Sequence, residues 1–154
     1  MIKDVGWRME QEIRFCTAAD GARIAYSLVG EGPPLVKAPN WLTHIEFEWK
    51  SPVWRHWWVE LAKSHQLIRF DQRGSGLSDR SVQGQSFETW VSDLGSVVDD
   101  PGLGQFPLLG ISQGGAIAAA YTAGHPGRVS RLIMYGAYPR GRAKRGDSAD
   151  ELEA

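Results

Sequence analysis

One stretch, residues 106–121 with the sequence FPLLGISQGGAIAAAY, limits what this chain can fold into more than any other. Its first four residues form an apolar run as long as a buried strand, and the residues from Gln113 onward are small, apolar and favour a helix. Ser112 therefore lies at a strand-to-helix junction. Gly110 and Gly114, two residues to either side of it, remove the Cβ atoms that would collide if the main chain turned sharply there. The sequence thus predicts a tight turn that presents the Ser112 hydroxyl beyond the end of a strand.

This turn has the spacing of the G-x-S-x-G nucleophile elbow, Gly110-Ile111-Ser112-Gln113-Gly114. The new helix directs its free N–H groups, that of Gln113 among them, toward any group that bonds to the serine hydroxyl, which favours a developing oxyanion. The alternative is a glycine-bordered turn with an incidental serine, because five-residue patterns occur by chance. A strand before the motif and a helix after it favour the functional interpretation.

Composition is that of an ordinary soluble domain, with 154 residues of which 42% are hydrophobic and 23% charged. The net charge of −1 gives no electrostatic reason to expect nucleic acid or an anionic membrane as a partner. The single cysteine, Cys16, excludes an intrachain disulfide framework and a cysteine metal cluster, and we expect no cofactor or metal. No apolar signal segment or run of 18 apolar residues occurs, so we expect a cytoplasmic protein.

Along the rest of the chain, strand-like and helix-like segments alternate. The expected strands are 12–17 and 22–29, joined by a turn at Asp20-Gly21, and then 35–38, 66–70 and 129–135. The expected helices are 51–64, opened by Ser51-Pro52, and a helix capped by Ser86 and stopped at 100–102, whereas 41–50 is expected to be a loop. This alternation predicts an α/β fold with a mostly parallel sheet, helices on both faces and an antiparallel hairpin at one edge.

Two further expectations follow from these elements. Tryptophans and a leucine in the first helix fall at i, i+3, i+4 and i+7, which is more simply a buried helix face than a ligand box; they are Trp54, Trp57, Trp58 and Leu61. Ligands of parallel sheets bind beyond the carboxyl ends of the strands. The loops after Ala38, Phe70 and Ile111 lie at that end, so we expect Trp41, Arg73 and Ser112 to share one site.

Three motifs together make residues 12–138 resemble the N-terminal half of an α/β-hydrolase: the elbow, the D-x-R-G-x-G-x-S loop at 71–78, and Gly124-His125-Pro126 before the strand 129–135. The chain is similar in particular to hydrolase-like domains that occur alone or fused to bacterial regulators and cyclases, in which Pro-Asn-Trp follows the third strand. The resemblance implies an extension at 1–10, an incomplete core at 11–138, and a linker or the start of a lid at 139–154. On this resemblance we expect these 154 residues to lack the lid and last strands of that fold.

The resemblance also implies an oxyanion hole. Most of the family has His-Gly after the third strand, and the N–H of the next residue supplies half of the hole. Here the aligned pair is Pro39-Asn40, so the two donors are expected to be the backbone N–H groups of Trp41 and Gln113. Asparagine at position 40 lacks the conformational freedom of glycine, although it tolerates a left-handed backbone better than most residues.

The catalytic acid and histidine of the family follow the nucleophile on later loops, and no histidine follows His125. A continuous helix puts His125 roughly 20 Å from the serine, because each helical residue rises about 1.5 Å. His65 precedes its strand and lies at the wrong end of the sheet, while His56 is on the tryptophan helix. His44 alone is on the correct face, but it approaches from the oxyanion side and is a poor base. Asp71 is expected to order its own glycine loop rather than to act as the triad acid.

The leading hypothesis is therefore a serine hydrolase of the carboxylesterase type, acting on a small acyl ester or related substrate through Ser112, with base and acid missing from this chain. The competing hypothesis is a catalytically weak or inactive hydrolase-like interaction or sensory module. Nucleotide binding is disfavoured because residues 110–115 do not match G-x-G-x-x-G.

The strand 129–135 is interior in the complete fold, so its apolar residues would lie on an open sheet edge here. We expect self-association, or a second chain that supplies the missing half of the fold.

Overall fold

An antiparallel hairpin begins the computed structural model, which describes residues 9–138. Its strands are β1 (Glu12–Thr17) and β2 (Arg23–Val29). The turn between them uses Gly21 at φ +89°, and the Asp20 carboxylate accepts a hydrogen bond from the Ala22 N–H at 3.2 Å. The hairpin predicted from Asp20-Gly21 is therefore confirmed. The segment expected to be a linker or lid, residues 139–154, and most of the expected N-terminal extension lie outside the described residues.

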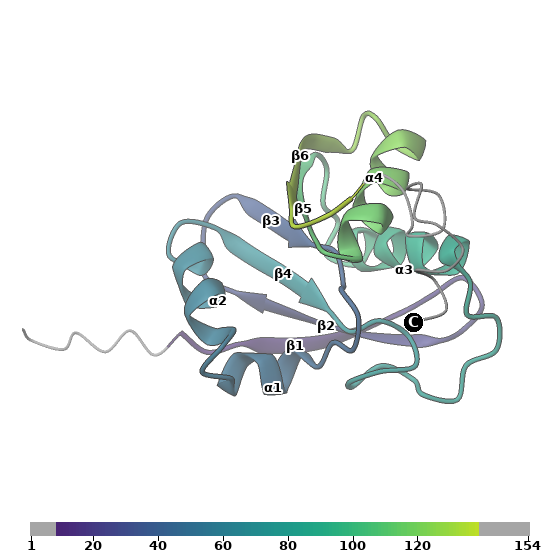
Figure 1. Ribbon diagram of the computed structural model, residues 1–154, viewed down its shortest axis with the longest axis horizontal. Helices are drawn as coiled ribbons and strands as arrows, with labels where there is room; N and C mark the ends of the chain where they lie inside the picture. Colours follow the sequence, from purple (N-terminus) through teal and green to yellow (C-terminus); the bar gives the residue numbers. More distant parts are fainter. Residues whose placement is uncertain (1–8, 139–154) are drawn as a thin grey trace, which may run out of the picture.

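The sheet has six strands in the order β1-β2-β4-β3-β5-β6 (Figure 1). The later four are β3 (Pro34–Lys37), β4 (Gln66–Phe70), β5 (Phe106–Ile111) and β6 (Val129–Tyr135). These four run parallel to one another, whereas β2 pairs antiparallel with β4. The predicted mostly parallel sheet with an antiparallel hairpin at one edge is thus confirmed. The carboxyl ends of β3, β4 and β5 meet at one edge of this sheet, as a shared site requires.

Helices cover both faces of the sheet (Figure 1). On one face, α3 (Phe87–Asp99) and α4 (Gly114–Gly124) pack over the larger apolar cluster. On the other face, α2 (Arg55–Ala62) buries Trp58, with Trp54, Trp57 and Leu61 partly buried around it. The tryptophans therefore form a packed helix face, as their spacing predicts. Within residues 9–138, no helix combines the length and apolar character needed to cross a bilayer.

The segment 41–50 corrects one prediction, because it contains a short helix, α1 (Ile45–Lys50), where a loop was expected. The Asp71 carboxylate accepts a hydrogen bond from the Ile45 N–H at 2.8 Å, so a contact from a distant loop starts a helix that the local pattern does not announce. Ser51 then caps the carboxyl end of α1 instead of opening the next helix, which begins only at Arg55.

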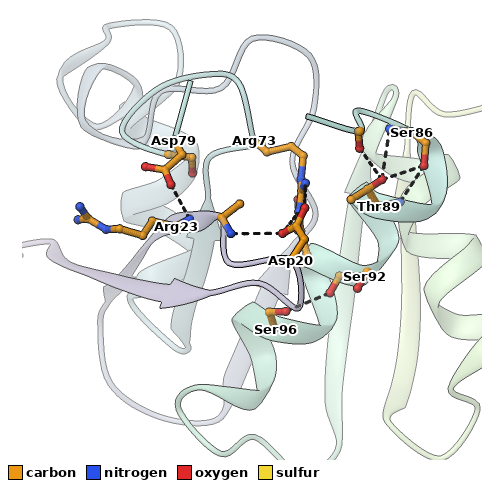
Figure 2. A network of polar contacts seen from close by, with 12 residues as sticks. Asp20, Arg23, Arg73, Asp79, Ser86, Thr89, Ser92 and Ser96 are labelled. Carbon is orange, nitrogen blue, oxygen red and sulfur yellow. Dashed lines mark hydrogen bonds and ion pairs between the residues drawn. The ribbon is translucent and has the colours of Figure 1, made fainter. Parts of the chain in front are cut away.

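The helix α3 begins as the sequence predicts. The Ser86 side chain accepts a hydrogen bond from the Thr89 N–H at 3.2 Å, and the Thr89 hydroxyl in turn accepts one from the Ser86 N–H at 3.3 Å. These reciprocal bonds form a capping box, which Figure 2 shows at the start of the helix. The helix therefore has a fixed beginning, and Asp93 on its inner side is held at a defined place under the loop that follows β4.

Candidate functional site

Ser112 lies at the turn between β5 and α4, with its side chain exposed. Its φ of +52° lies in the left-handed region, which serine adopts reluctantly. Two main-chain hydrogen bonds hold it there: the Ser112 N–H donates to the Tyr135 carbonyl at 3.0 Å, and the Ser112 carbonyl accepts from the Gly115 N–H at 3.0 Å. The backbone strain is thus maintained by the ends of β6 and α4, on either side of the turn.

Glycine is required on both sides of Ser112 by close packing of the main chain. A Cβ atom on Gly110 would lie 2.6 Å from the Cα of Gly115, and one on Gly114 would lie 2.7 Å from the Pro39 carbonyl oxygen. Both neighbours belong to the backbone and cannot move aside as a flexible side chain can. The second contact also shows that the loop after β3 lies directly against the start of α4.

That loop carries Trp41, one of the two expected oxyanion donors. Trp41 and Leu42 form a turn on the surface, and the Trp41 side chain is 72% exposed. Among the hydrogen bonds that join residues 9–138, none uses the backbone N–H of Trp41 or Gln113. The strained residue here is Leu42, with φ +56°, while Asn40 keeps a negative φ. Two free donors therefore lie on neighbouring segments at the carboxyl end of the sheet.

Asp71 orders the loop that follows β4. Its carboxylate accepts hydrogen bonds from the backbone N–H groups of Ile45 and Leu77, each at 2.8 Å. Burial raises the pKa of Asp71, and these two N–H donors oppose that rise. Gly76 lies so close to the carboxylate that a Cβ atom there would overlap it. The two acceptor oxygens are used within the loops, as expected for a residue that orders its own glycine turn.

The chain's four histidines all lie within residues 9–138, and none makes a hydrogen bond to Ser112 there. His44 caps α1: its Nδ1 accepts from the Phe47 N–H at 3.4 Å, and its ring stacks on that of Phe47. His125 caps α4 and stacks on Tyr121, His65 contacts the end of α2, and His56 is exposed on α2. Three of the histidines therefore lie at helix ends and the fourth on the surface.

Arg73 does not join Trp41 and Ser112, contrary to the expectation from its loop. Its guanidinium is buried and makes paired hydrogen bonds to Asp93 on α3 (2.6 and 2.7 Å) and to Asp20 in the hairpin turn (2.6 and 3.2 Å). Figure 2 shows the Arg73 side chain directed at Asp20. The prediction fails because two carboxylates on other elements draw the side chain beneath its own loop. The position of Arg73 in the sequence did not indicate that its side chain would bind Asp20 and Asp93.

A pair of buried cations beside the site was missed by sequence reasoning. Lys37 on β3 and Arg69 on β4 are 2% and 1% exposed. The Arg69 guanidinium pairs with Glu48 on α1 at 2.8 Å, and Lys37 Nζ donates to the Asn40 side-chain oxygen at 2.5 Å. A detectable signal existed, because a lysine and an arginine each interrupt an otherwise apolar interior strand. In the part of the chain that the structure describes, no three His, Cys, Asp or Glu side chains gather as a metal ion requires.

Comparison with known proteins shows which family this chain resembles. A family model described as alpha/beta hydrolase fold matches residues 47–151. The chain is 31% identical over 126 residues to a non-heme haloperoxidase from Rhodococcus erythropolis, covering 81% of this chain and 44% of that protein. It is 35% identical over 138 residues to the AB hydrolase superfamily protein YisY of Bacillus subtilis (strain 168), covering 81% and 48%.

Solved structures give the same result. An esterase from Rhodococcus sp. ECU1013 is 32% identical with a TM-score of 0.69, over 81% of this chain and 46% of that one. The epoxide hydrolase CorEH is 28% identical with a TM-score of 0.75, over 90% of this chain and 46% of that one. The chain thus spans less than half the length of these relatives.

Proposed function

The chain belongs to the α/β-hydrolase fold family, and on that premise we propose that it is a serine hydrolase of the carboxylesterase type with Ser112 as its nucleophile. Its relatives include esterases, epoxide hydrolases and haloperoxidases, which support a hydrolase in general. The narrower assignment to small acyl esters rests on the residues of the site.

The observation that carries the proposal is the positive φ of Ser112 between two glycines that close packing requires. Strained backbone persists where the surrounding structure enforces it, and such positions cluster at active sites. A serine in this conformation at the end of β5 projects its hydroxyl beyond the sheet, where a carbonyl carbon can approach. The free N–H groups of Trp41 and Gln113 are suited to the oxygen of that carbonyl.

The proposed reaction has two stages. In the first, Ser112 Oγ bonds to the acyl carbon, its proton passes to a base and then to the departing alcohol, and an acyl-enzyme forms. In the second, water attacks the same carbon, and the carboxylic acid leaves as the serine hydroxyl is restored. The N–H groups of Trp41 and Gln113 donate to the carbonyl oxygen as its negative charge develops in each stage. The proposal requires a base from outside these 154 residues.

The test is hydrolysis of a short p-nitrophenyl ester by the purified chain and by its Ser112→Ala variant. We expect the variant to lose the activity above the rate in buffer. Ser81→Ala, a change of the same kind in an exposed loop, serves as the matched control and should keep it. Equal rates for Ser112→Ala and the unaltered chain would refute the hydrolase assignment for this chain.

A specific observation supports the second candidate, a hydrolase-like interaction or sensory module. His44, His65 and His125 are engaged elsewhere and His56 is exposed on α2, so no histidine is hydrogen-bonded to Ser112 in the described residues. Without a triad base, about 10³- to 10⁴-fold catalysis over water is typical. A fluorophosphonate probe separates the candidates, because it labels only an activated serine. Labelling that disappears in Ser112→Ala favours the hydrolase, and an unlabelled but folded chain favours the module.

A further inference from the structure

Lys37 is a charged side chain in the interior of the sheet, on β3 between β4 and β5. It is 2% exposed, and its ammonium lies 5.3 Å from the centre of the Trp58 ring. A buried ammonium is costly unless it is paired and hydrogen-bonded. Within residues 9–138 its hydrogen-bond partner is the side-chain oxygen of Asn40, at 2.5 Å. A buried cation held by a single neutral acceptor calls for a physical reason.

The nearby charges do not supply that reason. Glu48 and Asp71 act on Lys37 from α1 and from the loop after β4, but Glu48 is bonded to Arg69 and Asp71 accepts from two backbone N–H groups. Burial lowers the pKa of Lys37 to about 8; Glu48 and Asp71 oppose the shift, and Arg69 adds to it. Asn40 is therefore the one group to which the ammonium is bound directly.

Asn40 immediately precedes Trp41, so its side chain sits at the start of the exposed turn. The far end of the same loop is fixed by Thr43, whose buried hydroxyl accepts a hydrogen bond from the Gln72 N–H at 2.9 Å. Between these two anchors, Trp41 and Leu42 are exposed, and Leu42 has the strained φ of +56°. The direction of the Trp41 N–H thus depends on how firmly both ends are held.

We propose that Lys37 is a positioning residue for this loop: its ammonium holds the Asn40 side chain and so fixes the backbone at Trp41. The inference rests on the proposed function, because the loop matters to catalysis as the carrier of an oxyanion donor. The side-chain bond between Lys37 and Asn40 thus fixes the conformation of the loop at its first residue. A displacement near 1 Å at such a donor is enough to slow a reaction substantially.

The first test is Lys37→Met, which keeps the length of the apolar stem and removes the donor. We expect the ¹⁵N order parameters of the Trp41 and Leu42 amides to fall from about 0.85 to below about 0.6. We also expect kcat for the ester, and the rate of fluorophosphonate labelling, to fall about tenfold with KM little changed, since an oxyanion contact acts in the transition state. Lys63→Met is the matched control: Lys63 is an exposed lysine paired with Glu60, and its loss should alter neither readout.

Raising the pH supplies a readout that a purely structural lysine would not move. Between pH 7 and 9 the ammonium, whose pKa is about 8, loses its proton, so the Asn40 bond weakens. The order parameters of Trp41 and Leu42 should therefore fall over this range in the unaltered chain. In Lys37→Met they should already be low and should not change with pH.

Asn40→Ala removes the acceptor and is the second variant, in case Lys37→Met fails to fold. It should loosen the same two amides, and the double variant should be no looser than either single one. Unchanged order parameters in a folded variant would overturn the proposal, and so would loss of a cooperative melt in both variants, which would make the pair a support of the whole fold. The order parameters can be measured on a chain without enzymatic activity. An inactive parent chain would therefore refute the proposed hydrolase function, but the role of Lys37 in holding the loop could still be tested.

Discussion

A serine at φ +52° stores backbone strain of about 1 to 2 kcal/mol, because its Cβ crowds the following carbonyl oxygen. The strain comes from the Cβ atom and not from the hydroxyl. Ser112→Ala therefore keeps it, whereas Ser112→Gly removes it. The two variants are equally incapable of nucleophilic attack, so their comparison isolates the conformational term.

We predict that Ser112→Gly is more stable than Ser112→Ala by about 1 kcal/mol, measured by urea denaturation. The usual order is the reverse, because glycine loses more conformational freedom on folding. Ser81 provides the control: its φ is not positive, so Ser81→Gly should be no more stable than Ser81→Ala. If both positions show the same order, the turn at Ser112 is not strained in solution.

Arg73 connects three parts of the chain. From its own loop, its side chain binds Asp20 in the hairpin turn and Asp93 on α3. Arg73 and Asp93 have side chains 1% and 2% exposed. Removing one partner of a buried pair leaves the other charge uncompensated, at a cost of about 3 to 5 kcal/mol. We therefore predict that Arg73→Met lowers the free energy of unfolding by about 3 kcal/mol at pH 7. Arg80→Met, in the exposed part of the same loop, should change it by less than about 0.5 kcal/mol.

The pH dependence identifies the mechanism. Burial raises the pKa of Asp93, and its hydrogen bonds to Arg73 oppose that rise. Without Arg73 the pKa rises further, so the folded variant binds a proton more tightly than the unfolded chain does. The stability that protonation of Asp93 contributes to the folded variant is then fully present below the unfolded pKa of about 3.9. It is lost as the pH rises through the folded pKa. In denaturation experiments, the stability lost in Arg73→Met relative to the parent should be recovered progressively as the pH is lowered from 7 toward that unfolded pKa. A constant difference over that range would contradict this account.

The elements themselves were largely predictable. All six strands and the capped start of α3 follow from apolar runs, turn residues and Ser86, which act locally. Two of the failures share one cause, since α1 begins at a bond from Ile45 to Asp71 and Arg73 turns toward Asp20 and Asp93. Each depends on a contact between residues distant in sequence, which neither periodicity nor propensity encodes.

The candidate site likewise has features that the local sequence predicts and features that depend on distant contacts. The turn at Ser112 and its flanking glycines could be located from five residues, because the spacing of the serine and the two glycines is a local signal for the turn. The Lys37–Asn40 contact could not be located in this way, because it depends on Trp58 of α2 covering the lysine. His125 was placed correctly at the end of a helix and His56 on the tryptophan helix, whereas His44 was expected in a loop and instead caps α1.

The two edge strands of the sheet are of different kinds. One edge is the hairpin strand β1, and the other, within residues 9–138, is β6, where six consecutive residues after Val129 are exposed (Figure 1). A strand with a single covered face exposes alternate residues. Partial exposure of Leu132, Ile133, Met134 and Tyr135 in succession means that neither face of β6 is fully covered there.

Long, apolar, unpaired edges are templates for pairing with another chain, and a lysine on the edge is a common way to block it. We propose that the 154-residue chain alone associates with a second copy through β6, and we predict a mass above that of the 17.1 kDa monomer in light scattering. Ile133→Lys should shift the chain toward the monomer, because Ile133 is 43% exposed in the middle of the strand. Phe15→Lys makes the same change on β1 at the opposite edge, where Phe15 is 44% exposed, and should leave the mass unchanged. A monomer for the unaltered chain would contradict the proposal, and a mass lowered equally by both variants would place the contact elsewhere.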